Sequence, residues 1–415
     1  MTLLDYLETE FASFEEKPFC ELDAAVFTQL AMVKIELPLC ESGAYALDAD
    51  GVLIDRESPH EHLHISLLEL LKAEFFSDMF TGLAAPEVKD CFILAAMNRR
   101  FRDVVITNYQ SVFSAEQATQ FAAMSFENNQ FCFIAYRGTD TSLIGWREDF
   151  DIAAFNPVPA QALGLNFALR GLSNAPEKPL YIGGHSKGGN IAEYVALSAP
   201  QDLREKLSLV YSFDGPGFKQ DAFTPDQFAA IAPLFVKYVP QDSIIGMALD
   251  SLSAYTVVRS TEMGIMQHDV FSWQIDGEKF QRRDSLSPAA LSFSSALEQW
   301  VHSYSEQEIE EFTDALFEAL KDFDSFAWDK FFGAGVQPIR YLRTIARQLD
   351  SQRAATLKRF ASDLADCLRA AAANQANNTI SSAREQIENT FDAMKSSFDK
   401  NNEKGLALGE EEPEK

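Results

Sequence analysis

The residue pattern with the clearest chemical meaning in this sequence is Gly184-His185-Ser186-Lys187-Gly188, which fits G-x-S-x-G. The apolar segment Leu180-Tyr181-Ile182 precedes it, and a helical apolar periodicity follows it as far as Pro200. A strand that turns sharply into a helix holds such a serine at its apex, and the glycines leave room for the turn. We therefore predict that Ser186 is a nucleophile and that the backbone N–H of Lys187 binds an oxyanion.

A serine nucleophile needs a general base, and the sequence contains six histidines. In folds with such an elbow the base follows the serine in the chain, which leaves His268 and His302. His268 lies in a polar loop after the last predicted strand, whereas His302 lies in a segment with helical periodicity. We predict that His268 is the base; the alternative is a solvated loop histidine.

The acid that would orient His268 has two candidates, because an aspartate follows each of two successive predicted strands. Asp214 ends the strand 207–213 and opens a Gly-Pro-Gly turn, and Asp242 follows the strand 235–239. Functional groups gather at the carboxyl ends of parallel strands, so either carboxylate could face the base. The rigid turn favours Asp214. Asp242 remains the alternative, with a simple turn aspartate as its other interpretation.

A second oxyanion donor is expected from an earlier strand end, and Tyr136-Arg137-Gly138-Thr139-Asp140 fits that place. The backbone N–H of Thr139, helped by its hydroxyl, would pair with that of Lys187. The same segment also fits a tight turn in which Arg137 makes a structural ion pair. The two interpretations are compatible, with Arg137 as a brace and Thr139 as a donor.

The sequence around these residues alternates between predicted strands and helices from about residue 101. Apolar strands separated by helices predict an α/β fold with a mostly parallel central sheet, covered on both faces. A capping box at 114–117 predicts a helix in this region. Earlier residues predict amphipathic helices and a hairpin at 45–54. The strand candidates are 104–106, 131–136, 180–182, 207–213, 235–239 and 255–258.

We expect three parts: residues 1–285, with the sheet in about 101–285; a helical extension at 286–400; and an acidic, disordered tail at 401–415. Within the extension, helical patterns cover 337–372 and 380–399, and one further helix presents an apolar face. This face must be buried against the rest of the chain or against a second chain. It consists of Ile309, Phe312, Leu316, Leu320 and Phe323.

Composition excludes some functions. The 415 residues include 35 Lys and Arg against 62 Asp and Glu, a formal net charge of −27. That charge argues against nucleic acid and against docking on anionic membranes through a basic surface. No apolar run approaches a bilayer span and the first residues lack a basic leader, so we expect a cytoplasmic protein. The five cysteines are scattered, which fits a reducing compartment.

Three other segments have a functional and a structural interpretation. The histidines of 60–64 could bind a metal, but no cysteine or fixed carboxylate accompanies them, so we expect no metal and no cofactor. The aromatic stretch 75–80 fits a lid over an acyl pocket, although core packing is the commoner role at helical spacing. The segment 146–150 fits either a pocket lining or the start of a surface helix.

Four segments together resemble a family of largely uncharacterised bacterial lipase-like α/β-hydrolases. They are Tyr136 to Thr139, Gly184 to Asn190, Phe213 to Phe218 and Gln267 to Asp269. The R-G-T and G-H-S-x-G elements are also similar to those of class 3 lipases. The resemblance covers roughly residues 20–280 and implies a serine hydrolase with Ser186 as nucleophile and His268 as base.

Relatives of this kind differ in where they carry the acid. Class 3 lipases place the acid after a later strand, and the position of Asp242 is partly similar to that arrangement. Pancreatic-type lipases place it directly after the strand that follows the elbow, as at Asp214, so the resemblance leaves both candidates open. Lys187 stands where lipases usually carry Leu or Gln, which departs from the pattern of enzymes with fatty substrates.

The predicted function is cleavage of a small-molecule or lipid acyl ester by a Ser-His-Asp triad, without integral membrane association. The alternatives on the same triad are an acyltransferase, a thioesterase or a peptidase. A catalytically silent scaffold that binds a protein partner or a second copy through its helical extension is the alternative from another class.

Overall fold

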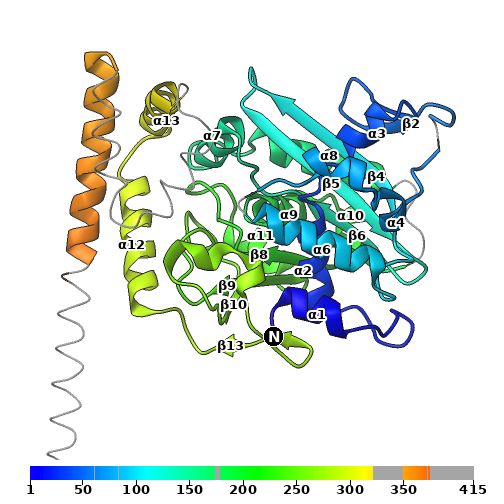
Figure 1. Cartoon of the computed structure of the whole chain (residues 1–415). Coiled ribbons are helices and arrows are strands. Elements are labelled where there is room, and N and C mark those ends of the chain that lie inside the picture. Colours follow the sequence, from blue (N-terminus) through cyan, green and yellow to red (C-terminus); the bar gives the residue numbers. More distant parts are fainter. Residues whose placement is uncertain (60, 83, 173–177, 321–348, 372, 374–415) are drawn as a thin grey trace, which may run out of the picture.

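A sheet of nine strands forms the centre of the molecule in the computed structural model, which describes residues 1–59, 61–82, 84–172, 178–320, 349–371 and 373 (Figure 1). The strands lie in the order β13-β10-β9-β8-β7-β6-β5-β4-β3. They are β3 (Ile65–Ser66), β4 (Val105–Ser114), β5 (Thr119–Glu127), β6 (Cys132–Tyr136), β7 (Leu180–His185), β8 (Leu207–Phe213), β9 (Phe235–Pro240), β10 (Tyr255–Val258) and β13 (Arg282–Arg283).

The sheet is mixed rather than mostly parallel. Strands β6 to β10 are parallel neighbours, as their continuous apolar runs predict. The pairs β3–β4, β4–β5 and β5–β6 are antiparallel, and so is β10–β13 at the other edge. The elbow strand β7 lies inside the parallel part, so the carboxyl ends of β6, β7, β8 and β9 meet at one edge.

The helix predicted from the capping box at 114–117 is wrong. Ser114 ends β4, the residues after it form a turn, and Ala118 has a φ of 47°. The Ser114 Oγ does accept a hydrogen bond from Gln117 N (3.2 Å), but within that turn. A serine three residues before a glutamine satisfies a turn as well as a helix start. The burial of Thr119 to Phe126 in β5 favours the β4–β5 hairpin over a helix.

Helices cover both faces of the sheet, as the alternating pattern predicts. On one face the N-terminal helices bury Phe27 and Phe92 with Phe126 and Phe133 of the sheet. On the other face α8 (Pro159–Leu172), α9 (Lys187–Ser198) and α11 (Pro225–Ile231) pack on β5 to β8. The N-terminal helices are α1 (Leu3–Thr9), α2 (Glu21–Leu30), α3 (Glu36–Glu41), α4 (Leu67–Leu70), α5 (Phe76–Met79) and α6 (Ala85–Met97).

Shorter elements connect these layers. The predicted hairpin at 45–54 forms as β1 (Tyr45–Leu47) and β2 (Leu53–Asp55). The remaining elements before the extension are α7 (Leu143–Asp151), α10 (Gln201–Lys206), β11 (Ile275–Asp276), β12 (Lys279–Phe280) and the 3-10 helices η1 (Ala73–Phe75), η2 (Gly264–His268) and η3 (Val270–Ser272). Among the described residues, no helix is long and apolar enough to cross a membrane.

The residues after 285 contribute α12 (Pro288–His302), α13 (Glu306–Leu320) and a helix over 351–371. The described members of the predicted apolar face of α13 are buried, and its Phe312 contacts Phe150 of α7 and stacks on Phe360 of the last helix. In Figure 1, α13 lies beside α7. Of the other predictions for this region, Phe323, residues 337–348 of the pattern predicted at 337–372, the helix at 380–399 and the tail at 401–415 lie outside the described residues.

Candidate active site

The predicted elbow at Ser186 has the geometry of a strained strand-to-helix turn. Strand β7 ends at His185 and α9 begins at Lys187, so Ser186 lies between them with φ 58° and ψ −129°. A positive φ is uncommon for a residue with a side chain and marks backbone strain. A Cβ on Gly184 would lie 2.1 Å from the Gly188 carbonyl carbon, so only glycine fits there. Ser186 itself is half-buried.

The carboxylate next to the imidazole of His268 belongs to Asp214. His268 Nδ1 lies 2.6 Å from Asp214 Oδ2. Asp214 is 1% exposed, and its Oδ1 accepts hydrogen bonds from Ser243 Oγ (2.5 Å) and Gly246 N (3.1 Å). Both carboxylate oxygens therefore have partners, which is how a buried carboxylate is held in one orientation. The His268 side chain is 15% exposed, so it is not sealed from solvent.

Asp242 contacts the residue before the histidine instead. Its backbone N–H donates to Gln267 Oε1 (2.8 Å), and Gln267 Nε2 donates to Asp242 Oδ2 (2.6 Å). Gln267 is 1% exposed, and its carbonyl accepts the indole N–H of Trp273 at 2.8 Å. Asp242 thus anchors η2, the short helix that carries His268. Sequence reasoning missed Gln267, and its only signal was its place beside the predicted base.

His185, in the second position of the elbow motif, contacts the same short helix. Its Nε2 lies 2.8 Å from the His268 carbonyl oxygen, and the two imidazole rings lie 4.5 Å apart. Burial, and then the nearby His268, lowers the pKa of His185 to about 3. His185 is therefore neutral at pH 7 and donates from Nε2 to that carbonyl. The sequence marked this residue only as part of the motif.

The turn that carries Thr139 lies directly against the elbow. A Cβ on Gly138 would lie 2.8 Å from the His185 carbonyl oxygen and 3.5 Å from Ser186 Cβ. The Thr139 hydroxyl donates to Asp149 Oδ2 at 2.6 Å, so it already has a partner. The backbone N–H of Thr139 remains the expected donor. Burial raises the pKa of Asp149 to about 6, against the opposing effects of Lys187 and the Thr139 hydrogen bond.

Arg137 braces this turn from behind. It is 2% exposed; its Nε donates to the Ala31 carbonyl (2.7 Å), and its Nη2 donates to the Val33 carbonyl and the Tyr109 hydroxyl (2.8 Å each). These bonds tie the end of β6 to the end of α2. The nearest carboxylate, Glu36, lies 3.9 Å from Nη1, so carbonyl oxygens rather than an ion pair supply most of its contacts.

The predicted lid segment 75–80 and the other downstream histidine, His302, make contacts that do not involve Ser186. Phe76 and Phe80 contact Phe92 of α6, with ring centroids 6.2 and 5.8 Å apart, which is core packing rather than a free lid. His302 lies on α12, where its Nε2 is 2.8 Å from Asp250 Oδ1.

Two groups of side chains bear on metal binding. In the segment 60–64, His62 contacts Asn108 (3.3 Å), His64 is exposed, and His60 lies outside the described residues. The described residues hold one other group of ligand type, Asp250, Glu298 and His302, whose ligand atoms lie within 4.8 Å of one another. Its members are half-buried or exposed, and exposed acidic groups often approach one another without a metal.

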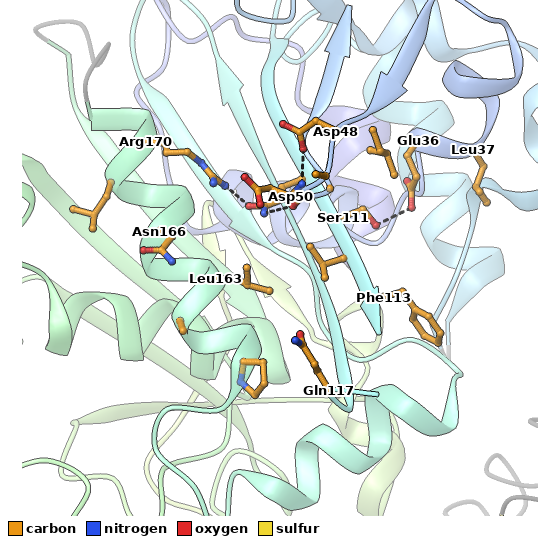
Figure 2. A pocket seen from close by; sticks show the side chains of 18 residues that line it. Glu36, Leu37, Asp48, Asp50, Ser111, Phe113, Gln117, Leu163, Asn166 and Arg170 are labelled. Atoms are coloured by element: carbon orange, nitrogen blue, oxygen red, sulfur yellow. Dashed lines mark hydrogen bonds between the residues drawn. The ribbon is translucent and has the colours of Figure 1, made fainter. Parts of the chain in front are cut away.

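A cavity of about 1290 Å³ lies between the β1–β2 hairpin, β4 and α8. Figure 2 shows Asp48, Asp50 and Ser111 on one side of it and Asn166 and Arg170 on the other. Ser186, His268 and Asp214 are not among its lining residues. This cavity is therefore separate from the residues gathered around Ser186.

The comparisons with known proteins show one family for this chain. The model of the Mbeg1-like family matches residues 95–318, more than half of the 415 residues. Among solved structures, a crystal structure of M37 lipase is 16% identical with a TM-score of 0.31, and the match covers 42% of this chain and 65% of that one. The comparison with curated proteins found no match. The mixed α/β architecture with its large central sheet is compatible with an α/β-hydrolase.

Proposed function

We propose that this chain, which belongs to the lipase-like Mbeg1-like family, is a serine hydrolase that cleaves acyl esters. The observation that carries the proposal is the 2.6 Å contact between His268 Nδ1 and Asp214 Oδ2, at the sheet edge where the strained Ser186 turn lies. A histidine oriented by a buried carboxylate beside an elbow serine is the arrangement that activates a nucleophile.

In the proposed reaction Ser186 Oγ attacks the ester carbonyl carbon while His268 Nε2 takes the hydroxyl proton. Asp214 holds the imidazole with its Nδ1 proton directed at the carboxylate and stabilises the imidazolium. The backbone N–H groups of Lys187 and Thr139 would stabilise the oxyanion. His268 then protonates the leaving alcohol, and a water molecule, deprotonated by the same imidazole, releases the acid from Ser186.

Lys187 does not argue against an uncharged acyl substrate. Its side chain is 1% exposed, and its ammonium is bonded to Gln120 and Glu148. A substrate at Ser186 would therefore meet the backbone N–H of Lys187 and not its charge. The departure from the usual lipase residue at this position is therefore compatible with an ester that has an apolar acyl group.

The test is covalent labelling of the whole protein with a fluorophosphonate, together with hydrolysis of p-nitrophenyl butyrate. Ser186→Ala should abolish both signals, because only a serine activated by a base attacks phosphorus or an ester rapidly at neutral pH. Ser198→Ala is the matched control: this serine is also half-buried and ends the same helix. Undiminished labelling of Ser186→Ala would overturn the proposal, and an unreactive wild-type protein would favour the silent scaffold.

The same enzyme preparation separates the alternative reactions on this triad. An ester, a thioester and an anilide that share one butyryl group should be compared by kcat/KM. We expect the ester to be cleaved fastest. A preference of tenfold or more for the thioester or the anilide would reassign the enzyme as a thioesterase or a peptidase.

A further inference from the structure

The side chain of Lys187 makes a buried polar contact that the proposed reaction does not use. Its Nζ donates to Gln120 O (2.8 Å), Gln120 Oε1 (2.8 Å) and Glu148 Oε2 (2.9 Å). An ammonium has three N–H donors, so each of them has an acceptor. Lys187 is 1% exposed and Glu148 is fully buried, so this is an ion pair inside the protein.

The partners of Lys187 also contact the turn that carries Thr139. Gln120 Oε1 lies 3.4 Å from the Asp140 backbone N, and Gln120 Nε2 lies 3.5 Å from the Gly138 carbonyl, both long hydrogen bonds. Asp149, the residue after Glu148, accepts the Thr139 hydroxyl at 2.6 Å. The side chain that follows the nucleophile and the turn opposite it therefore share neighbours in β5 and α7.

The carboxylate of Glu148 is fixed independently of the lysine. Its Oε2 also accepts the backbone N–H of Gln120 (3.1 Å), and its Oε1 accepts the backbone N–H of Ala160 at the start of α8 (2.9 Å). Glu148 thus joins α7 to β5 and α8. The ammonium of Lys187 is bonded to this fixed position rather than to a mobile surface carboxylate.

Stability alone does not explain a buried pair of this kind. Desolvation of the two charges offsets most of their attraction, and apolar residues of similar volume often do as well or better. What the pair adds is a defined geometry, because three short bonds converge on one atom. The residue that makes them is also the one whose backbone N–H is the first proposed oxyanion donor.

We propose that the Lys187 side chain is a positioning group that holds the backbone N–H of Lys187 in register with the backbone N–H of Thr139, through Gln120 and Glu148. The inference rests on the proposed function, since it requires these two N–H groups to form the oxyanion hole. Such donors act on charge that develops only in the transition state. Loss of the register should therefore lower kcat and leave KM almost unchanged.

The first test is Lys187→Met, which keeps the length of the side chain and the backbone N–H. We expect kcat for p-nitrophenyl butyrate and the fluorophosphonate labelling rate to fall about 10- to 100-fold, less than the 10²- to 10³-fold typical when a donor is removed. KM should stay within about threefold, and the pH midpoint of the rate should not move. The control is Lys178→Met, which removes a lysine bonded to Glu127 and Asn128 at the amino end of β7.

A second variant separates positioning from mere stability. Lys187→Met leaves the Glu148 carboxylate buried without its cation, so the protein will lose stability or fail to fold. The double variant Lys187→Met/Glu148→Gln removes that charge but keeps only one of the two acceptor oxygens of Glu148, so it should recover most of the lost melting temperature. If kcat stays low in this refolded double variant, the positioning role is supported. Recovery of kcat together with the melting temperature would overturn it.

The reaction of the wild-type protein distinguishes a failure of the positioning role from a failure of the proposed function. If the wild-type protein reacts and Lys187→Met reacts equally fast, only the positioning role is wrong. If the wild-type protein does not react with the fluorophosphonate at all, the proposed function fails and the positioning role fails with it.

Discussion

The carboxyl ends of β8 and β9 make an instructive comparison. Each strand is followed by an aspartate, and the two strands are parallel neighbours. Asp214, after β8, is 1% exposed, has a φ of 49°, and contacts His268. Asp242, after β9, is half-buried and contacts Gln267. Two similar strand ends thus present their carboxylates to consecutive residues of η2.

The difference shows that the loop after β9 supports the carboxylate at the end of β8. Ser243, which follows Asp242, donates to Asp214 Oδ1 at 2.5 Å, and Gly246 N donates to the same oxygen at 3.1 Å. Meanwhile Asp242 and Gln267 hold η2 in place. The β9 loop therefore orients both members of the His268–Asp214 pair, through the contacts of Ser243 with Asp214 and of Asp242 with Gln267.

The largest expected effect on kcat comes from replacing the two acids, one at a time, by asparagine. Asp214→Asn should lower kcat by about 10⁴-fold, because an amide does not hold the imidazole in the required tautomer. Asp242→Asn should stay within about tenfold, since an amide still bonds Gln267. Steady-state hydrolysis of p-nitrophenyl butyrate measures both. The reverse pattern would move the acid to Asp242.

A smaller loss is expected for Ser243→Ala, which removes one donor from the Asp214 carboxylate. A hydrogen bond to a charged group is worth about 1.5 to 3 kcal/mol, so kcat should fall roughly 10- to 100-fold. Ser243→Thr keeps the hydroxyl and should retain most of the activity. Unchanged kcat in Ser243→Ala would mean that the β9 loop does not orient Asp214.

The next effect is a pH dependence of stability that involves His185. Its pKa is lowered to about 3 by burial, so between pH 6.5 and that value the unfolded chain binds a proton that the folded protein does not. The contribution of His185 to the free energy of unfolding should therefore be intact above pH 6.5 and fall as the pH is lowered, by about 1 kcal/mol in the first unit.

His185→Gln is the comparison variant, because the amide can still donate to the His268 carbonyl. Urea unfolding at pH 6.5 and 5.5 should show a smaller loss for this variant than for the wild-type protein. Equal losses in the two proteins would show that His185 titrates normally in the folded state.

The smallest effect is expected for Gln267→Leu, which removes the bonds between η2 and Asp242 but leaves His268 against Asp214. Each lost hydrogen bond costs about 1 kcal/mol of stability, and kcat should change by less than about fivefold. Thermal unfolding and ester hydrolysis measure the two quantities. A loss of kcat as large as that of Asp214→Asn would show that η2, and not the carboxylate, controls the imidazole.

The sequence predicts the middle of the fold better than its edges. Strands β6 to β10 match the predicted segments because a buried parallel strand is a continuous apolar run, which is a local signal. The β4–β5 hairpin was missed because Ser114 and Gln117 satisfy a turn and a helix start equally well. The contact of Phe312 in α13 with Phe150 of α7 also had no local signal, although the apolar face that contains Phe312 was predicted.

At the site, the sequence by itself determined the nucleophile candidate Ser186, the base candidate His268 and two candidate acids, because motif and chain order are local or ordinal properties. Only the tertiary structure placed Asp214 against His268, across 54 residues of chain, and Lys187 Nζ against Gln120, across 67. Such contacts depend on which strands are neighbours and on the rotation of one short helix. Both follow from the packing of the whole chain and leave no trace in the residues nearby.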